Sequence, residues 1–383
     1  MQYHIVVGES TPQAGGMCRH MDMLAEGLAD EFHQVHVWSP SATNLGCESA
    51  NVDIHKTLGN LSPRYLRHTG RMLNAFPLPR RLLVYWVPHA YGYNSMNLAF
   101  CLWLWFRSAW RKDRVELMVQ ECFLSFTRRS WRQSAVAVVH RVMTMVVLRA
   151  ADQVWLALSG YEGRLKPFAL GRRVSFGWLP VPSTVEVVHD PARVSKIRAD
   201  MAPKGFLIGH FGTFGWPIAD LLENIVPPLL RGTDAAMVLL GTGGAEFRER
   251  LLVRHPDLAP RLYATGYLDD TALSCFLSAC DVMVQPYPDG LTARRSSALA
   301  PMAHGRPVVT NASPITEPLW RESGAVVFAP ATGAGFLNAV RSLRLNPAEY
   351  QRVSAAASET YGDYFEPAQM VKIIRGDAPP VHA

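Results

Sequence analysis

The sequence is short of features that mark several large classes of protein. Its six cysteines show no CxxC spacing, which argues against a zinc site or a disulfide framework and favours a reducing compartment. The most apolar run, at residues 98–106, has about half the length needed to span a bilayer. The amino terminus has no basic stretch or cleavage site, so we expect no signal peptide and a cytoplasmic protein.

Motifs for catalysis or for nucleic-acid binding are equally scarce. The sequence has no P-loop, no HExxH motif and no G-x-S-x-G nucleophile elbow, and its histidines lack metal-ligand spacing. The segment GTGGAEF at 241–247 lacks the third glycine and the later acidic residue of a dinucleotide fingerprint. No basic stripe is interleaved with aromatic residues. We therefore expect no metal, no cofactor and no nucleic-acid partner.

The composition is that of a globular protein with uneven charge. The 383 residues are 49% hydrophobic and 18% charged, which leaves room for about two domains. Residues 1–190 hold 20 Lys+Arg against 14 Asp+Glu and the rest of the chain holds 18 of each, so the net charge of +6 lies in the first half. This excess favours anionic ligands, or peripheral contact with the inner face of the membrane through the basic N-terminal domain. Core packing explains the apolar helix expected at 96–110, and docking on a membrane surface is the alternative.

Strands and helices alternate along the whole chain. Short runs of β-branched and apolar residues predict strands at 3–7, 34–38, 82–87, 115–119, 153–158, 206–211, 236–240, 262–265, 281–285, 307–310 and 326–328. Amphipathic or apolar helices separate most of these strands. The alternation predicts an α/β protein with two doubly wound, Rossmann-like domains. The segment 179–205, which begins with a proline-rich stretch, is predicted to link domain 1–178 to a second domain that begins at 206.

Residues 280–310 form the strongest candidate for a binding site. Their sequence, CDVMVQPYPDGLTARRSSALAPMAHGRPVVT, predicts a strand, a loop, a helix at 292–303 and another strand. A loop at the carboxyl end of a strand that carries two cations and two hydroxyls suits a phosphate group, and a solvated basic loop is the alternative. These four residues are Arg294, Arg295, Ser296 and Ser297. Near the amino terminus, Gly15-Gly16 would let a ligand approach the backbone closely, with a plain tight turn as the alternative.

Together these segments resemble the GT-B glycosyltransferases, and specifically glycosyltransferase family 4. The resemblance rests on Gly15-Gly16 followed by MCRHMDMLAEGLADEFHQVHVWS, and on LLGTGG, TGYLDDTALSCFLSACDVMVQPY, LAPMAHGRPVVT and Ile315-Thr316-Glu317, in the order that the family has them. It implies two Rossmann-like domains that face a central cleft, with the acceptor bound by 1–178 and a nucleoside diphosphate sugar by 206–361. It also implies that 362–383 include a helix that crosses back to the N-terminal domain.

The resemblance further implies a reaction. A hexose would move from a UDP- or GDP-linked sugar to the hydroxyl of a sugar, lipid-linked or small-molecule acceptor, with retained configuration and without a metal, in polysaccharide, glycolipid or metabolite glycosylation. A phosphate oxygen of the donor would take the acceptor's proton, and closure of the cleft would bring Gly15-Gly16 onto the diphosphate.

The sequence departs from the family on the donor side. The family's Glu-x7-Glu pair falls at Thr292 and Ala300, neither of which is acidic. The Arg and Lys that the family places after the strand at 206–211 are also missing, because no cation precedes Arg231 there. Arg294 and Arg295 are the nearest substitutes and would neutralise leaving-group charge. Ser296 or Ser297 would replace the lost contact to the ribose.

The acceptor side differs as well. The histidine that the family places in its catalytic site corresponds here to Gln120, next to Glu121, and His89 after the preceding strand is an alternative. The implied acceptor-binding residues are therefore His89, Gln120 and Glu121, and the implied catalytic residues are His89, Glu121, Arg294 and Arg295. The implied donor-binding residues are Gly15, Gly16, Thr213, Gly241, Tyr267, Leu268, Pro286, Asp289, Thr292, Arg294, Arg295, Ser296, Ser297 and Glu317.

Structural roles compete with several of these assignments. Tyr267, which would contact the base, has packing as its alternative, and Glu317 has a helix cap shared with Thr316. A backbone hydrogen bond would account for His89, and pairing with a nearby arginine would account for Glu121. Three functions remain open: a retaining hexosyltransferase, a GT-B sugar-nucleotide epimerase or hydrolase, and a catalytically silent GT-B partner subunit.

Overall fold

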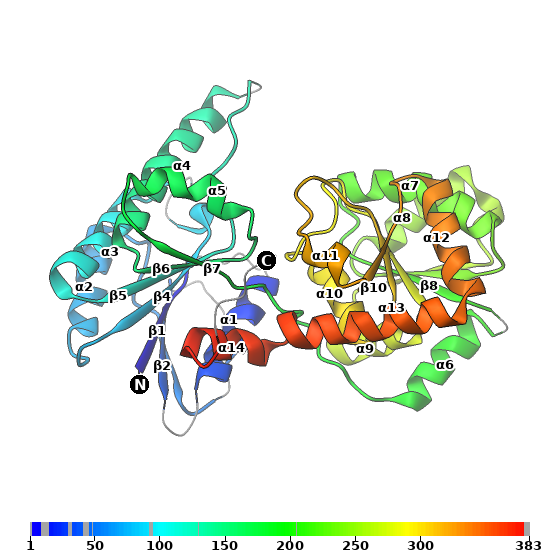
Figure 1. Ribbon diagram of the computed structural model, residues 1–383, viewed down its shortest axis with the longest axis horizontal. Coiled ribbons are helices and arrows are strands. Elements are labelled where there is room, and N and C mark those ends of the chain that lie inside the picture. The colour runs from blue at the N-terminus through cyan, green and yellow to red at the C-terminus, as the bar shows by residue number, and fades with distance from the viewer. Residues whose placement is uncertain are drawn as a thin grey trace. The chain divides into compact units, whose positions relative to one another are not determined.

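The chain divides into two compact units. The computed structural model describes residues 2–8, 15–29, 33–40, 46–47, 49–91, 95–128, 130–203 and 205–378, with side chains in the first helix described from Cys18 onward. Unit 1 comprises Met1–Val181 and Pro367–Ala383, and unit 2 comprises Pro182–Glu366 (Figure 1). Among the helices described, none combines the length and the apolar character that crossing a bilayer requires.

Unit 1 is built on a parallel sheet to which its described residues contribute seven strands. The strands are β1 (Gln2–Val6), β2 (Gln34–Trp38), β3 (Val52–His55), β4 (Arg81–Trp86), β5 (Arg114–Val119), β6 (Gln153–Leu156) and β7 (Ser175–Trp178), in the order β3-β2-β1-β4-β5-β6-β7. The α-helices are α1 (Gly15–Leu28), α2 (Pro63–Leu73), α3 (Leu98–Arg111), α4 (Trp131–Ala150), α5 (Tyr161–Leu165) and α14 (Pro367–Arg375).

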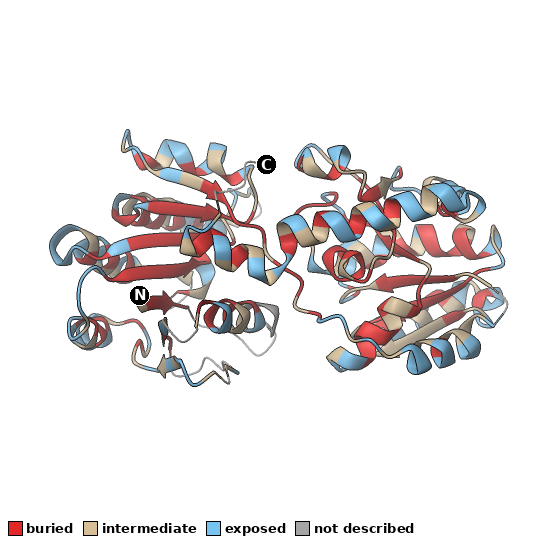
Figure 2. Ribbon diagram, turned by 60° about the horizontal axis from the view of Figure 1, so that its bottom comes forward, coloured by how far each residue is buried: buried red, intermediate tan, exposed pale blue. Residues whose placement is uncertain are grey.

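Side-chain alternation along the strands of unit 1 creates a core on each face of the sheet. On β4, Leu82 and Val84 pack in a cluster with side chains of α2, α3 and α4. Leu83 and Tyr85 pack in a second cluster with side chains of α1 and α14. Helices therefore cover both faces, and Figure 2 shows buried residues concentrated along the strands between them.

The last helix of the chain is held in unit 1 by contacts that span almost the whole sequence. Arg81 Nη2 on β4 donates a hydrogen bond to Ile374 O at 2.6 Å. His20 Nε2 on α1 lies 3.1 Å from Met370 Sδ, and Arg375 Nη2 donates to Leu28 O at 3.1 Å. These contacts fix α14 against α1 and the sheet of unit 1.

Two buried carboxylates organise the charges beneath the sheet of unit 1. Asp113 is fully buried and pairs with both Arg80 and Arg107, with its Oδ1 2.6 Å from Arg80 Nε. Glu116 accepts two hydrogen bonds from Arg81, at 2.7 and 2.9 Å, and one from Trp155 Nε1 at 2.9 Å. Burying these charges is tolerated because each carboxylate has several donors.

Unit 2 repeats the same architecture with a sheet of six parallel strands among its described residues. The strands are β8 (Leu207–Phe211), β9 (Ala236–Leu240), β10 (Leu262–Gly266), β11 (Val282–Gln285), β12 (Val308–Thr310) and β13 (Val326–Phe328), in the order β10-β9-β8-β11-β12-β13. The α-helices are α6 (Pro191–Met201), α7 (Trp216–Arg231), α8 (Gly244–Arg254), α9 (Asp270–Ala279), α10 (Ser296–Ala303), α11 (Leu319–Glu322), α12 (Gly333–Leu345) and α13 (Pro347–Thr360). Side chains of α7, α8 and α12 share a core with the strands, and α6, α9, α10 and α13 pack in sequence on one another.

Four segments differ from what the sequence predicts. Strands β3 and β7 are short and contain polar or glycine residues, so they lack the apolar pattern that identifies the other strands. Residues 191–201 of the expected linker form α6 in unit 2, which begins with Pro191 and is capped by Asp190 accepting a hydrogen bond from Arg193 N at 3.0 Å. The helix expected at 292–303 begins only at Ser296, because the residues before it form a loop held by other contacts.

Candidate functional site

Each sheet has one point at which the chain reverses its direction across the sheet. In unit 1 this switch point lies between β1 and β4, and in unit 2 it lies between β8 and β11. The loops that leave neighbouring strands there diverge to opposite faces, which leaves a crevice for a ligand at the carboxyl ends of the strands. The predicted donor loop, residues 286–295, follows β11 directly and therefore lies at the switch point of unit 2.

Backbone and side-chain hydrogen bonds fix the first half of this loop. Asn311, which follows β12, accepts from Tyr287 N and donates to Tyr287 O, each at 2.8 Å. Leu291 N donates to Asn311 O at 2.9 Å. Gly290 has a φ of +73°, and a Cβ there would lie 2.6 Å from Ser313 N, so only glycine fits. The loop is thus a rigid part of the unit.

Glu317 holds the second half of the loop through hydrogen bonds to its backbone. It is 4% exposed, and its two carboxylate oxygens accept from Ala293 N at 3.1 and 3.2 Å. Trp320 Nε1 donates to Oε2 at 2.9 Å. Burial raises the pKa of this carboxyl, and the donated hydrogen bonds oppose the rise. The alternative that Thr316 and Glu317 cap a helix is wrong, because α11 starts after Pro318 without a side-chain cap.

The two arginines of the loop lie in different surroundings. Arg295 pairs with Asp289, and its Cζ lies 4.7 Å from the centre of the Tyr287 ring. Its guanidinium is therefore committed to contacts inside the loop. Arg294 is half-buried and precedes it directly. Both stand immediately before α10, whose N-terminus has no side-chain cap.

The hydroxyl residues and the remaining loop residues complete this edge. Ser296 is exposed, whereas Ser297 Oγ lies 2.9 Å from Tyr287 OH. Pro286, the first residue of the loop, is buried. The positions of the family's acidic pair are also buried, with Thr292 3% exposed and Ala300 fully covered. A carboxylate at either position would need its own buried donors.

Two buried polar side chains at this switch point were missed by reading the sequence. His210 on β8 is 1% exposed, its Nδ1 donates to Val284 O at 2.8 Å, and its Nε2 has no partner among the described residues. Burial lowers the pKa of His210 to about 4, so the ring is neutral. Gln285 at the end of β11 donates to Ser297 O at 2.9 Å, while its Oε1 also lacks a partner in the described part of the chain. A polar residue within an otherwise apolar strand is the sequence signal that would have found both.

The loops after β8 and β9 approach each other so closely that they need glycines. Gly241 has a φ of +116°, and a Cβ there would lie 2.3 Å from Gly212 O. A Cβ on Gly212 would in turn lie 3.3 Å from His210 Nε2. Thr213 beside them is exposed and leads to α7, whose N-cap Gly215 provides no side-chain cap. Backbone N–H groups at such a helix start suit an anion.

Two exposed aromatic side chains stand at the same edge of unit 2. Tyr267 follows β10 and is 82% exposed, so the alternative that it packs in the core is wrong. Leu268 beside it is half-buried. Trp216, the first residue of α7, is also 82% exposed. Flat, accessible rings of this kind suit stacking against a nucleobase.

Arg231 does not supply the cation that is missing after β8. It is the last residue of α7, and its guanidinium makes two hydrogen bonds of 2.8 Å to the carboxylate of Asp257. It stands at the opposite end of α7 from the loop, so its charge is used away from the switch point.

Unit 1 places two of the three predicted acceptor residues together. His89 follows β4 and Glu121 follows β5, and Nδ1 of the histidine lies 3.3 Å from Oε2 of the glutamate. Their side chains are 50% and 40% exposed, so this edge offers a polar pair to solvent. Gln120 is 7% exposed, and its backbone N–H donates a hydrogen bond to Trp86 O that extends the pairing of β4 and β5. The buried side chain makes Gln120 the weakest of the three candidates.

The predicted glycine loop falls largely outside the described residues. α1 begins at Gly15, so Gly15 and Gly16 form its first turn. Residues 9–14 before them lie outside the described residues. Gly8 at the end of the preceding stretch is described, and a Cβ there would lie 2.5 Å from Ala90 O, so the two chain segments at the switch point of unit 1 are in close contact.

Comparison with known proteins agrees with this geometry. A family model described as Glycosyl transferases group 1 matches residues 205–346, which contain every strand of unit 2. HepE of Anabaena, solved in complex with UDP, aligns with 98% of this chain and 99% of its own at 15% identity and a TM-score of 0.66. A sucrose-phosphate synthase of Thermosynechococcus elongatus aligns with 98% of both chains at 14% identity and a TM-score of 0.68.

A third solved structure has a different named activity. A Listeria monocytogenes protein, provisionally named a UDP-N-acetylglucosamine 2-epimerase, aligns with 100% of both chains at 13% identity and a TM-score of 0.62. No curated protein sequence matches the chain.

The fold and the family match together define the class. The chain has the GT-B fold, with two Rossmann-like doubly wound domains, as the sequence predicts. Residues 205–346 match the glycosyl transferases group 1 model, so the resemblance to GT-B glycosyltransferases is confirmed.

Proposed function

We propose that this protein is a retaining glycosyltransferase that moves a hexose from a UDP- or GDP-linked sugar to an acceptor hydroxyl. The observation that carries the proposal is the position of the rigid 286–295 loop. It lies at the switch point of unit 2, inside the segment that matches the glycosyl transferases group 1 model. HepE, which has the same fold, has been solved with UDP and with UDP-glucose, which supports a nucleotide sugar as the donor.

In this proposal, unit 2 binds the donor along the carboxyl edge of its sheet. The first N–H groups of α7 and α10 point their positive dipole ends to the diphosphate, and Arg294 adds a formal charge. Tyr267 and Trp216 stack on the base. Thr213, Gly241, Leu268, Pro286, Asp289, Thr292, Ser296 and Ser297 shape the rest of the donor site, and Arg295 and Glu317 hold the loop in place.

The transfer step then needs little further chemistry from the protein. The acceptor hydroxyl attacks the anomeric carbon from the side of the departing diphosphate, and a phosphate oxygen receives the hydroxyl proton. The bond from the sugar to the phosphate oxygen breaks, and the configuration is retained. Positive charge at the loop stabilises the leaving group without a metal ion. The pair of His89 and Glu121 orients the acceptor in unit 1.

Calorimetric titration and thermal unfolding with UDP, GDP, UDP-glucose and GDP-mannose test the donor site. A true donor present at about 100 times its Kd stabilises unit 2 by about 2.7 kcal/mol. Arg294→Ala should weaken binding by about tenfold or more, because a hydrogen bond to a charged group is worth about 1.5–3 kcal/mol. Lys196→Ala, on the exposed face of α6, is the matched control and should change nothing. If no nucleotide or nucleotide sugar stabilises the protein, the proposal is wrong.

Two alternative functions would give different products from the donor. The buried, non-acidic Thr292 and Ala300 favour a catalytically silent partner subunit, which would bind a nucleotide sugar and release no nucleoside diphosphate with any acceptor. The likeness to the provisional epimerase favours a sugar-nucleotide epimerase or hydrolase, which would convert the donor without any acceptor. Mass spectrometry of the nucleotide and sugar products separates the three functions.

A further inference from the structure

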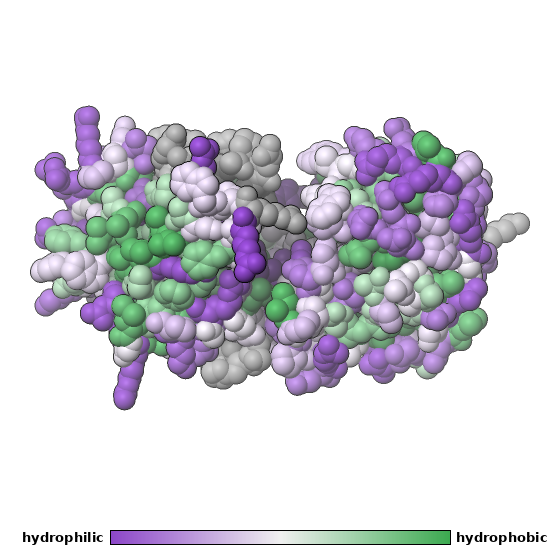
Figure 3. Space-filling view, turned by 90° about the horizontal axis from the view of Figure 1, so that it is seen from above, coloured by the Kyte–Doolittle hydropathy of each residue, from purple (hydrophilic) through white to green (hydrophobic). Residues whose placement is uncertain are grey.

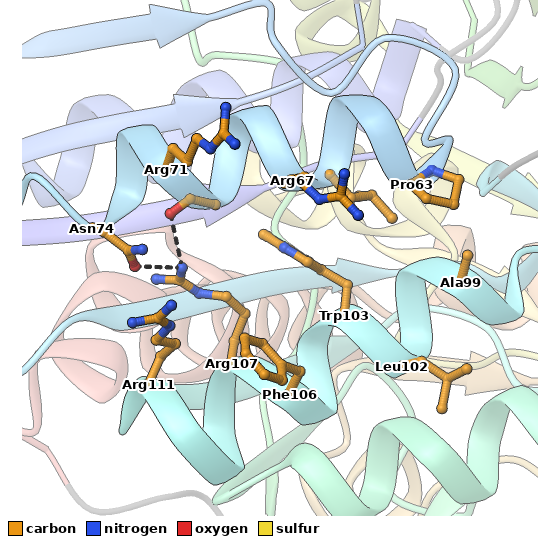
Figure 4. Close-up of a pocket in the computed structure, with 12 residues that line it drawn as sticks. Pro63, Arg67, Arg71, Asn74, Ala99, Leu102, Trp103, Phe106, Arg107 and Arg111 are labelled. Atoms are coloured by element: carbon orange, nitrogen blue, oxygen red, sulfur yellow. Dashed lines mark hydrogen bonds between the residues drawn. The ribbon is translucent and has the colours of Figure 1, made fainter.

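A groove between α2 and α3 in unit 1 belongs to neither switch point. Its volume is about 510 Å³, within the range of small-molecule sites. Figure 4 shows that its lining comes from the two helices, with Arg67 and Arg71 on α2 and with Leu102, Trp103 and Phe106 on α3. The groove thus combines an apolar interior with guanidinium groups at its rim.

The helices are held at a fixed separation, so the groove is part of the fold. Arg107 on α3 is 2% exposed and donates to Gly70 O at 3.0 Å and to Asn74 Oδ1 at 2.8 Å, both at the α2 side (Figure 4). Its charge is balanced by the buried Asp113. A Cβ on Gly70 would lie 3.2 Å from Trp103 Nε1, so the glycine permits this close packing.

The charge around the groove has one sign. Residues 56–112 contain nine Lys+Arg and no Asp or Glu. Arg80, Arg81 and Arg107 are buried and pair with acidic residues of β5 or the turn before it. The other six cations are exposed: Lys56, Arg64, Arg67, Arg71, Arg111 and Lys112. Of these six, Arg67, Arg71 and Arg111 line the groove, so its rim attracts anions.

An exposed apolar stripe runs along α3 beside these cations. Leu98, Leu102, Phe106 and Trp110 are spaced four residues apart and are 40%, 46%, 42% and 59% exposed. The opposite side of α3 packs in the core through residues such as Phe100 and Leu104. Core packing thus explains one side of this helix and leaves the other side unexplained. Figure 3 shows such a gathering of hydrophobic side chains, in green, on a face of unit 1.

We propose that the α2–α3 surface binds anionic phospholipids at a membrane surface. The lipid phosphate binds Arg67, Arg71 and Arg111, which suit a bidentate contact with phosphate oxygens. The acyl chain enters the apolar interior of the groove, and the stripe on α3 lies in the interface between head groups and acyl chains. An anionic lipid fits better than a neutral ligand because the rim has no acidic residue that would balance its cations.

Vesicle flotation of the full-length protein tests this proposal. We expect flotation with vesicles of equal parts phosphatidylcholine and phosphatidylglycerol, and none with phosphatidylcholine alone. Each cation near an anionic surface contributes about 1 kcal/mol, so Arg67→Gln/Arg71→Gln should weaken the partition coefficient about 25-fold. Arg193→Gln/Lys196→Gln on the exposed face of α6 removes the same charge from unit 2 and should leave flotation unchanged.

The apolar stripe gives a second, independent readout. Phe106→Ser/Trp110→Ser keeps every cation and should still abolish flotation, because charge alone does not insert the helix. Raising the salt from about 0.1 M to about 1 M should weaken the wild type more than the Arg67→Gln/Arg71→Gln variant, because screening acts on the charges that the variant has lost. Equal flotation with neutral and anionic vesicles, or equal loss in the α6 control, would overturn the proposal. Competition by inorganic phosphate alone would indicate a free-phosphate site and would also overturn it.

The outcome does not depend on the donor site. Flotation involves no nucleotide sugar, and the residues proposed to bind lipid lie in unit 1, so a protein that fails to bind donors can still pass this test. An unchanged far-UV circular dichroism spectrum and thermal unfolding midpoint show that the Arg67→Gln/Arg71→Gln variant is folded.

Discussion

The two units have the same strand order around their switch points but expose very different chemistry there. In unit 2, the buried side chains of Glu317 and Asn311 hold the loop at residues 286–295 through hydrogen bonds to its backbone. Unit 1 presents His89 and Glu121 half-exposed at the equivalent edge. Topology therefore decides where each site lies, and the burial of its polar residues decides how rigidly it is held. The first arrangement suits the repeated binding of one kind of ligand, and the second suits contact with a variable one.

The largest expected difference between the units is their response to acid. Burial lowers the pKa of His4 to about 3 and of His20 to about 4 in unit 1, and of His210 to about 4 in unit 2. Because the unfolded chain binds these protons near pH 6.5, stability falls as the pH drops from 6.5 towards 4, by roughly 3 kcal/mol for each group. The pKa values of His36 and His140 in unit 1 are lowered too, as is that of His304 in unit 2.

Acid should therefore unfold unit 1 before unit 2. The raised pKa of Glu317 acts in the opposite direction, because the folded carboxyl takes up a proton at a higher pH than the unfolded one and so stabilises unit 2 on acidification. Hydrogen exchange measured on peptides from each unit between pH 7 and pH 4 would show which unit loses protection first. Earlier loss of protection in unit 2 would show that the histidines do not govern acid stability.

The next largest effect is expected from the buried carboxylate of unit 1. Asp113→Ala leaves the guanidiniums of Arg80 and Arg107 without their buried partner, which should cost about 3–5 kcal/mol of stability. Asp257→Ala in unit 2 removes an ion pair of similar geometry in which both side chains are about half-exposed, and no measurable change is expected. Urea unfolding of both variants measures the contrast. A loss of similar size in both would mean that burial does not control the contribution of these pairs.

The smallest effects on stability are expected at the two candidate sites, where a substitution in unit 2 should cost more than one in unit 1. Glu317→Ala should destabilise unit 2 by about 2–4 kcal/mol, since it leaves Ala293 N–H and Trp320 Nε1–H without an acceptor and opens a cavity. Glu121→Ala should change stability by less than about 0.5 kcal/mol, because the residue is exposed. Denaturant unfolding gives both values, and turnover with the true donor and acceptor shows whether Glu121 matters for activity.

Glu317→Gln is the conservative control in this series. It keeps one oxygen as the acceptor for Ala293 N–H and should recover most of the lost stability. A variant as unstable as Glu317→Ala would mean that the negative charge itself, rather than the hydrogen bonds, holds the loop.

The sequence predicts the fold well because the strands of both sheets are buried on both faces. Apolar β-branched runs such as those of β8 and β9 are distinct from amphipathic helices, and glycines at strand ends mark the loops. β3 and β7 escape prediction because they are only half-buried edge strands with mixed composition. The helix α6 escapes because a proline-rich segment precedes it, although Asp190 and Pro191 are a good helix start.

The candidate sites are predictable in position but not in detail. Strand ends identify His89, Glu121 and the 286–295 loop, since parallel strands bring their carboxyl ends to one edge. The pairing of Arg295 with Asp289 and the hydrogen bonds of Glu317 to Ala293 depend on loop geometry that local sequence does not encode. The groove between α2 and α3 depends on the burial of Arg107, which looks like an ordinary surface arginine in the sequence.

The docking of α14 also determines when unit 1 can complete its fold during synthesis. Met370, Ile373 and Ile374 complete the core on one face of the first sheet, and Arg81 and Ile374 are 293 positions apart in the chain. A ribosome therefore releases all of unit 2 before the segment that finishes unit 1 has emerged. Until then, the apolar side of α1 and the sheet beside it remain uncovered, which makes the nascent first unit the part most in need of a chaperone. A fragment that stops at Val181 would keep that exposed surface permanently, so the two units are unequal as independent folding domains.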